Sequence, residues 1–181
     1  MIETDRLLLR PMIAEDIDPL LMVFGDPLVM ASFGVPPFDR GQMREWVRRN
    51  LDHQDQHGYG LFTLILKEPG AIIGDCGLER MELDDGPATG LAVELGYDLR
   101  SNFWNRGLAT EAAVAVRAFG TLRLPRLVSL IRQGNIASRR VAEKAGMRHE
   151  RDIIRSGIPS WLFGSDAPDR AFIGDPPPIT R

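Results

Sequence analysis

The order of β-rich and helical segments in the middle of the chain most constrains the fold. Three β-rich runs follow one another at 59–66, 71–78 and 91–99. Short turn segments separate them, which favours an antiparallel meander. The pattern then becomes helical over 105–119, and a further strand is predicted at 127–132. A helix that crosses between two strands of one sheet makes them parallel, so the chain predicts a mixed sheet.

Further strands and helices are predicted before and after these central segments. An apolar strand is predicted at 7–9, and we expect it to end before Pro11 because a proline cannot donate to a strand ladder. A helix is predicted from Asp39 to Gly58, since apolar residues recur there at helical spacing. The other predicted elements are helices at 16–24 and 137–145, strands at 147–154 and 159–163, and turns at 67–70 and 84–87.

Length and composition indicate a single domain. A chain of 181 residues lies within the usual size of one domain. We place that domain at residues 1–164, because the remaining run, 165–181, contains four prolines and little to bury. This run is expected to be a loose tail. The formal net charge of −3 shows no basic excess, which argues against a nucleic-acid partner.

Cysteine content and the absence of long apolar runs favour the cytoplasm. Cys76 is the single cysteine, so neither an intramolecular disulfide nor a cysteine-rich zinc site can form. We interpret Cys76 as a structural strand residue, with a catalytic role as the alternative. No run approaches the roughly 20 apolar residues of a membrane span. Charged residues within 1–10 argue against a signal peptide, and we expect a cytoplasmic protein without a membrane partner.

The segment 100–111 carries the chemistry. There a strand leads into an irregular turn with the small residues Gly107 and Ala109, and the turn opens a helix. The first amides of a helix lack intrahelical acceptors and carry partial positive charge, so the turn suits a pyrophosphate. A plain strand-to-helix connection is the alternative. The spacing matches neither a P-loop nor an early G-x-G-x-x-G, which disfavours ATP and NAD.

Three segments, in order, resemble a known enzyme family. The run Trp104-Asn105-Arg106-Gly107-Leu108-Ala109 resembles the Q/R-x-x-G-x-G/A pyrophosphate loop of the GNAT N-acetyltransferase superfamily. The runs 4–11, 94–112 and 135–147 are similar to its RimJ/RimL-like branch, the ribosomal-protein and related N-acetyltransferases. Trp104, Asn105 and Met147 depart from the family pattern. Ala142 stands where many members carry a tyrosine that protonates the leaving thiolate.

The resemblance implies a fold and a reaction. The fold is α+β, with a mixed, mostly antiparallel sheet of about seven strands, flanked by about four helices and splayed at the cofactor cleft. The reaction is transfer of an acetyl group from acetyl-CoA to a primary amine, by direct attack and without a metal. The acceptor is a protein N-terminal α-amino group or a small amine. The oligomeric state stays open, with a homodimer as one alternative.

The resemblance also assigns cofactor contacts. Main-chain groups of Tyr97 and Leu99 pair with the pantetheine arm, next to a bulge predicted at Gly96. Asn135 lies near the thiol. The pyrophosphate loop comprises Trp104, Asn105, Arg106, Gly107, Leu108, Ala109 and Thr110. Arg139, Arg140 and Lys144 are candidates for the outer phosphates, and a solvated helix face is the alternative for these three.

Two residues are candidates for proton transfer. Glu94 matches the glutamate of the branch's E-x-G-Y pattern, and we expect it to accept the amine proton if burial raises its pKa. An ion pair or exposure to solvent is the alternative for Glu94. Ser138 matches the serine proposed in this branch to protonate the thiolate, and a role in helix capping is its alternative.

Two other functions remain open at this stage. Ala142 suggests a non-catalytic module that binds acyl-CoA and reports its level to a partner. An antibiotic-modifying acetyltransferase of the same fold would need an acidic acceptor cleft, to which the acidic stretch 79–85 contributes unless it is a surface turn. His53 and His57 are four residues apart. No H-E-x-x-H pattern accompanies them, so we predict no metal site.

Overall fold

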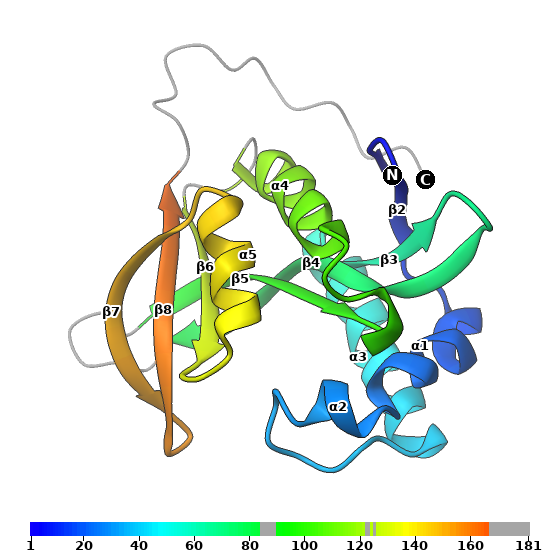
Figure 1. The fold of residues 1–181 in the computed structure, drawn as a ribbon, viewed down its shortest axis with the longest axis horizontal. Coiled ribbons are helices and arrows are strands. Elements are labelled where there is room, and N and C mark those ends of the chain that lie inside the picture. Colours follow the sequence, from blue (N-terminus) through cyan, green and yellow to red (C-terminus); the bar gives the residue numbers. More distant parts are fainter. Residues whose placement is uncertain (84–89, 122–123, 125, 167–181) are drawn as a thin grey trace.

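Eight strands form one mixed sheet through the molecule (Figure 1). The computed structural model describes residues 1–83, 90–121, 124 and 126–166. The sheet order is β1-β2-β3-β4-β5-β6-β8-β7, and each neighbouring pair is antiparallel except the parallel pair β5 and β6. The α+β class and the parallel crossover predicted from the sequence are confirmed.

The strands are β1 (Ile2–Glu3), β2 (Leu7–Pro11), β3 (Leu61–Leu66), β4 (Ala71–Leu83), β5 (Gly90–Leu99), β6 (Arg126–Arg132), β7 (Arg148–Arg155) and β8 (Ile158–Asp166). The helices are α1 (Ile17–Phe24), α2 (Pro27–Met30), α3 (Arg40–His57), α4 (Leu108–Thr121) and α5 (Ile136–Lys144). Short 3-10 helices lie at Ala14–Asp16 and Ser101–Phe103.

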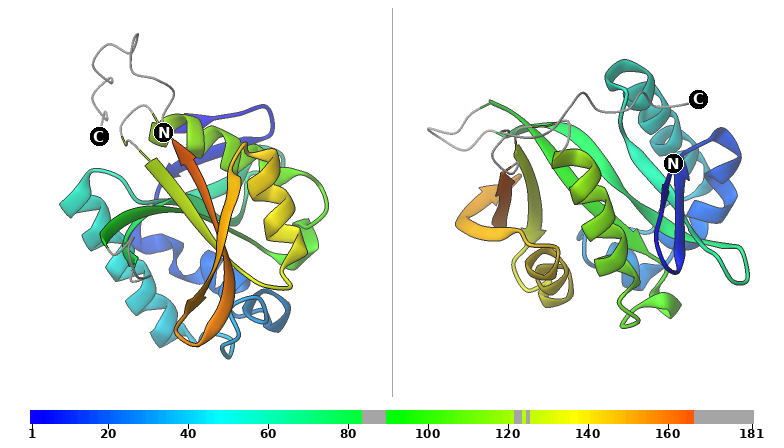
Figure 2. Two further views of the ribbon diagram at one scale, coloured as in Figure 1. Left: turned by 90° about the vertical axis from the view of Figure 1, so that its left-hand side faces the viewer. Right: turned by 90° about the horizontal axis from the view of Figure 1, so that it is seen from above.

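Helices cover both faces of the sheet. α4 and α5 lie on one face, and α1 and α3 lie on the other (Figure 2). Because side chains alternate along a strand, the sheet supplies residues to both cores. Leu95 packs with Val116 of α4 in one core. Leu61 packs with Leu20 of α1 and Met43 of α3 in the other.

The long helix α3 begins and ends where its sequence predicts. The Asp39 side chain accepts a hydrogen bond from the Gln42 amide, and the Gln42 side chain accepts one from the Asp39 amide. This capping box satisfies two amides at the helix start. Gly58 ends the helix in the left-handed conformation, at φ 70°, which glycine adopts without strain.

The sheet splits between β5 and β6. These strands are paired at one position, where Glu94 lies opposite Val128. β6 continues in a ladder with β8, whereas β5 stays in register with β4 along its whole length. The bulge predicted at Gly96 is therefore wrong, because Gly96 lies opposite Gly77 in an unbroken ladder. The two halves of the sheet separate because β5 and β6 stop pairing.

Two predicted boundaries need correction. Pro11 belongs to β2, opposite Phe62, rather than following the strand. The short β1 pairs only as far as Leu9, so no third strand requires an amide from Pro11. α4 begins at Leu108 rather than at 105, because the preceding residues form the turn described below.

Two short elements were not predicted, and some predicted segments lie outside the described residues. β1 has two residues and α2 has four, which is too short for a periodic pattern to show. The predicted hairpin between β3 and β4 is confirmed. The predicted turn at 84–87 and residues 167–181 of the predicted tail lie outside the described residues.

The opposed glycines of β4 and β5 give a test of this packing. A Cβ at Gly77 would lie 2.3 Å from the Gly60 carbonyl oxygen and 2.4 Å from Leu61 Cα. We expect Gly77→Ala to lower the free energy of unfolding by about 2 kcal/mol, measured by urea denaturation. A Cβ at Gly96 would meet no atom within 4 Å, so Gly96→Ala should stay within about 0.5 kcal/mol of wild type. Equal stabilities of the two variants would contradict the packing.

Candidate active site

A cavity of about 360 Å³ lies where β5 and β6 diverge. β5, β6, the N-terminal part of α5, the segment after α2 and the β7–β8 hairpin line it. Four of the predicted site residues meet in this lining, namely Glu94, Tyr97, Asn135 and Ser138. The remaining predicted residues, Leu99, the loop 104–110, Arg140 and Lys144, lie outside it.

One edge of β5 faces the side that β6 has left. The Arg100 amide donates to the Ile73 carbonyl of β4 at 2.9 Å. Because bonded pairs alternate along an antiparallel ladder, the main-chain groups of Tyr97 point away from β4. The Leu99 carbonyl points the same way and accepts a hydrogen bond from the Trp104 indole at 2.8 Å. Tyr97 thus presents its main-chain groups to the split, whereas the Leu99 carbonyl is already bonded.

The N-terminus of α4 leaves helix amides without acceptors. The first helical hydrogen bond runs from the Glu111 amide to the Gly107 carbonyl, at 3.0 Å. The amides of residues 108–110 therefore have no partner within the helix. Asn105 and Gly107 form the preceding turn with positive φ of 59° and 77°. Such a turn, followed by a helix start, is the arrangement that suits a bound anion.

The side chain of Arg106 does not extend this site. Its guanidinium donates to the Asn102 carbonyl at 2.9 Å and lies 5.2 Å from the centre of the Phe103 ring. Main-chain amides, rather than the Arg106 side chain, are the groups that this turn offers to an anion.

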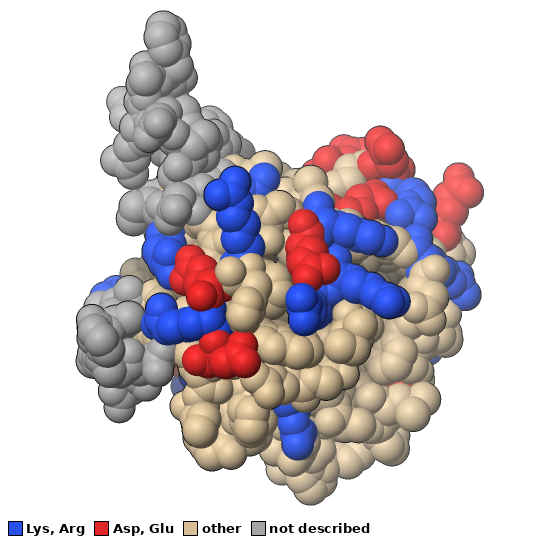
Figure 3. All heavy atoms as spheres, turned by 60° about the vertical axis from the view of Figure 1, so that its left-hand side comes forward, with Lys and Arg blue, Asp and Glu red and all other residues tan. Residues whose placement is uncertain are grey.

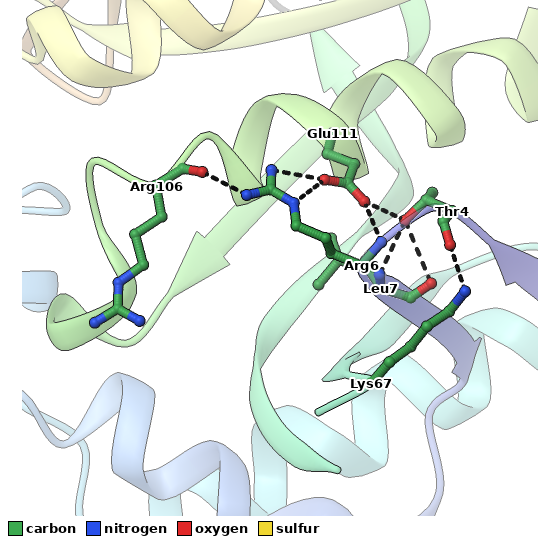
Figure 4. A network of polar contacts seen from close by, with 6 residues as sticks. All are labelled: Thr4, Arg6, Leu7, Lys67, Arg106 and Glu111. Atoms are coloured by element: carbon green, nitrogen blue, oxygen red, sulfur yellow. Dashed lines mark hydrogen bonds and ion pairs between the residues drawn. The ribbon is translucent and has the colours of Figure 1, made fainter. Parts of the chain in front are cut away.

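An unpredicted polar network joins the turn to the segment between β1 and β2 (Figure 4). The Glu111 carboxylate accepts hydrogen bonds from the Thr4 hydroxyl at 2.6 Å, the Arg6 amide at 2.9 Å and the Arg6 guanidinium at 2.7 Å. Arg6 donates further to the Arg106 carbonyl at 2.9 Å. Partial burial raises the pKa of Glu111, but the bonds from Thr4 and Arg6 outweigh it and lower the pKa. An ionised Glu111 therefore anchors the turn.

The start of α5 is fixed between β5 and its own cap. The Asn135 side chain caps the helix, because its oxygen accepts a hydrogen bond from the Ser138 amide at 3.1 Å. The Tyr97 hydroxyl donates to the Ser138 carbonyl at 2.7 Å. Asn135, not Ser138, is thus the capping residue, and the main chain of Ser138 is held on both sides. Ala142 is fully buried and serves packing.

The three basic residues of α5 differ in their surroundings. Arg139 forms an ion pair with Glu143 at 2.9 Å and lies 4.9 Å from the centre of the Trp161 ring. Arg140 and Lys144 are exposed. Lys and Arg side chains alternate with Asp and Glu on the face shown in Figure 3. Arg139 fits the alternative of a paired helix face, whereas Arg140 and Lys144 stay available for a ligand.

Glu94 lies at the point where the sheet splits. Its carboxylate accepts a hydrogen bond from the Leu130 amide of β6 at 3.2 Å. In a continued parallel ladder that amide would bond to a carbonyl of β5. Burial raises the pKa of Glu94 to about 7, against the opposing effects of the Leu130 amide and of Arg155. A carboxyl with this pKa gains and loses a proton near neutral pH, as a general base must.

Cys76 and His53, two other side chains that could react, are not available for chemistry. Cys76 is fully buried, and burial raises the pKa of its thiol well above the usual value, so the nucleophilic thiolate is disfavoured. His53 uses both ring nitrogens, one toward the Tyr59 carbonyl at 3.0 Å and one as acceptor from the Arg80 amide at 2.9 Å.

Over the described ranges no set of three or more His, Cys, Asp and Glu residues is placed to hold a metal ion. In that same part of the chain, no helix combines the length and apolar character of a membrane span.

The sequence matches a known enzyme family. A family model for the acetyltransferase (GNAT) domain matches residues 6–148. The chain belongs to this family. YkkB, an uncharacterized protein of Bacillus subtilis, is 34% identical over 163 residues, which span 88% of this chain and 92% of YkkB. The uncharacterized N-acetyltransferase p20 of Bacillus licheniformis is 31% identical over 150 residues, which span 81% of this chain and 82% of p20.

Solved structures of GNAT acetyltransferases share the fold. An acetyltransferase from Agrobacterium tumefaciens is 30% identical, with a TM-score of 0.75, covering 91% of this chain and 92% of its own. A structure of RimL, described as a ribosomal L7/L12 alpha-N-protein acetyltransferase in complex with coenzyme A, has a TM-score of 0.72 and covers 90% of this chain and 95% of its own. Its identity is 17%, so this likeness shows the fold alone.

The raised pKa of Glu94 predicts a pH-dependent stability. A carboxyl with a higher pKa in the folded state contributes stability fully below its unfolded pKa, near 4.5, and loses it as the pH rises through about 7. Since glutamine stays neutral, Glu94→Gln should raise the free energy of unfolding at pH 8 by on the order of 1 kcal/mol. This gain should shrink at pH 5.

Denaturant unfolding at the two pH values measures the difference. Glu68→Gln, in the exposed turn before β4, is the matched control and should match wild type at both. A gain for Glu94→Gln that is the same at both pH values would argue against a raised pKa at this position.

Proposed function

We propose that this acetyltransferase moves an acetyl group from acetyl-CoA to a primary amine by direct attack in a ternary complex. The observation that carries the proposal is Glu94, a carboxyl with a pKa of about 7 at the split of the sheet. The free amides of α4 and the main chain of Tyr97 lie on elements that lead away from the same split. A proton acceptor near an anion-binding helix end suits a protonated amine and a phosphate-bearing donor.

The residues present fit acetyl-CoA. The amides of residues 108–110 would hold the pyrophosphate, and the main chain of Tyr97 would pair with the pantetheine arm in the manner of an added strand. The exposed Arg140 and Lys144 would contact the outer phosphates. The Asn135 oxygen is used as a helix cap, so its amide NH2 is the group left for the cofactor. When bound, acetyl-CoA supplies the acetyl group as an activated thioester.

Glu94 accepts the proton that the acceptor ammonium must lose before attack. The amine nitrogen then bonds to the acetyl carbon, the carbon–sulfur bond breaks, and the departing thiolate takes a proton. Ser138 is the proposed donor, because it lines the cavity and Ala142 has no acidic group. The Tyr97 hydroxyl is committed to the Ser138 carbonyl, and burial raises its pKa. Once bonded to the acetyl carbon, the nitrogen carries one proton more than the amide product, and the loss of that proton replaces the one that Ser138 gave to the thiolate. Glu94 returns its own proton to solvent, which closes the balance.

We infer the kind of acceptor from the resemblance to the RimJ/RimL-like branch. The segments 4–11, 94–112 and 135–147 carry that resemblance. A cavity of about 360 Å³ lies at the small end of ligand pockets, which suits a single N-terminal residue of a protein or a small amine.

Turnover tests the proposed base. With acetyl-CoA and a panel of peptides and small primary amines, the wild type should release CoA thiol. Glu94→Gln should lower kcat/KM about 100-fold, because a positioned base contributes that much to a proton transfer. After correction for ionisation of the amine itself, kcat/KM of the wild type should rise with pH and level off above about 7. Glu68→Gln should behave as wild type.

Coenzyme A binding without turnover on any amine would contradict this proposal. It would favour the non-catalytic acyl-CoA-binding module instead.

The network at Arg6 gives an independent prediction for the cofactor turn. Arg6→Gln removes the guanidinium that holds the Arg106 carbonyl and the Glu111 carboxylate. We expect the Kd for coenzyme A, measured by calorimetry, to rise about tenfold, since a charged hydrogen bond is lost beside the turn. Lys67→Gln removes a contact to the Thr4 carbonyl on the far side of this network and should leave the Kd unchanged. Equal affinities of wild type and Arg6→Gln would show that the network does not position the turn.

A further inference from the structure

Four carboxyl groups share the face of β4 and β5 that is turned toward α1 and α3. Asp75 lies directly opposite Asp98, and Glu79 lies directly opposite Glu94. Residues at intervals of two along a strand point to the same face, so all four side chains lie on one side of the sheet. Like charges directly opposed on neighbouring strands repel, and each pair is costly when both members are ionised.

The pair Asp75 and Asp98 lacks a donor. Asp75 is fully buried, and neither of its carboxyl oxygens has a hydrogen-bond partner. Asp98 lines the cavity, and within the described ranges its carboxyl makes no ion pair or hydrogen bond. Burial, followed by repulsion from the neighbouring carboxyls, raises the pKa of both groups. A buried carboxyl without a donor is destabilising, so this pair is built for a partner that the described residues do not supply.

The cationic side chains of the cavity are directed elsewhere. Arg155 interacts with Glu94, and its guanidinium donates to the Met81 sulfur at 3.6 Å. Arg132 is exposed, and its guanidinium lies beside Gly34. Neither guanidinium supplies Asp98 with a charged donor, and a cationic group of a ligand in the cavity would do so.

We infer that Asp98, backed by Asp75, binds a second cationic nitrogen of the acceptor while the reacting amine lies at Glu94. This inference rests on the proposed function. Glu94 and Asp98 are four residues apart on one strand, which places their Cα atoms about 13 Å apart. Gly96 between them has no side chain, and a Cβ there would meet no atom within 4 Å.

A flexible chain can therefore pass over Gly96 from one carboxyl to the other. The substrate class that this arrangement recognises is a primary amine with a second ammonium several methylene groups away, as in a linear diamine. Charge attraction at Asp98 would lower the KM of such an acceptor relative to a simple amine.

Matched amines test the inference. Hexylamine and hexamethylenediamine have the same chain length and differ in the second ammonium group. In assays of CoA thiol release, the wild type should show a KM for the diamine about tenfold below that for hexylamine. Asp98→Asn should bring the ratio of the two KM values close to one. Asp55→Asn, an exposed carboxyl on α3, is the control and should keep the wild-type ratio.

Asp75→Asn supplies a second variant with a separate readout. Its amide can donate to Asp98, which satisfies that carboxyl internally and should also abolish the preference for the diamine. Because the substitution removes a buried carboxyl without partners, the Tm should rise. A preference that persists in both Asp75→Asn and Asp98→Asn would overturn the inference.

Calorimetry separates this inference from the proposed function. Hexamethylenediamine titrated into the protein with coenzyme A should give heat of binding, and Asp98→Asn should lose it. That result supports the site even where no acetyl transfer occurs. Turnover of both amines with equal KM in the wild type would overturn the inference and leave the proposed function standing. No heat with the diamine in the wild type would overturn the inference as well. The same holds if Asp98→Asn raises the KM of both amines by the same factor.

Discussion

The candidate site depends on how little β5 and β6 pair, since Glu94 and Val128 form their one pair. Beyond that pair a continued ladder would consume the main-chain groups of both strands, and no cleft would form. Side chains satisfy the groups that the split releases. The Ser129 hydroxyl donates to the Leu95 carbonyl at 2.6 Å, and the Leu130 amide donates to the Glu94 carboxylate. The same carboxylate thus ends the ladder and lines the space that the missing ladder leaves.

Alternation along β5 assigns different tasks to its two faces. Leu95 and Leu99 are buried in the main core with α4 and α5, and Tyr97 packs partly against it. The intervening residues, Glu94 and Asp98, turn acidic groups toward the cavity. Burial of these carboxyls costs stability at neutral pH, because their pKa values rise to about 7. A strand optimised for stability alone would carry apolar or paired residues there, so the acidic face is best explained by binding and proton transfer.

Local signals in the sequence were sufficient for much of the fold. The capping residues of α3, the hairpin of β3 and β4 and the crossover through α4 each follow from neighbouring residues. The turn before α4 was found because Gly107 stands between a strand and a helical pattern. The bulge at Gly96 was predicted wrongly, because a glycine within a strand also occurs where a cavity needs open space, and one sequence does not separate the two cases.

Long-range partners account for what the sequence could not predict. Arg6 and Glu111 are 105 residues apart, and each alone reads as an ordinary surface charge. The opposition of Asp75 and Asp98 depends on the register of β4 and β5, which the sequence between the two strands leaves undetermined. The sequence placed Glu94 and Ser138 as candidates through family resemblance. Their meeting in one cavity needed the packing of α5 against the divided sheet.

The three segments that resemble the family supply three parts of the candidate site. The segment 4–11 supplies Thr4 and Arg6, which anchor the turn before α4 through Glu111. The run 94–112 contains the proposed base, the free edge of β5 and the helix amides, and 135–147 supplies the cap that holds Ser138. Arg6 touches the turn through a carbonyl, so its effect on a cofactor passes through the main chain. A resemblance at 4–11, remote from the chemistry, thus has a physical reason: Thr4 and Arg6 hold Glu111 and the Arg106 carbonyl, on either side of the amides at 108–110.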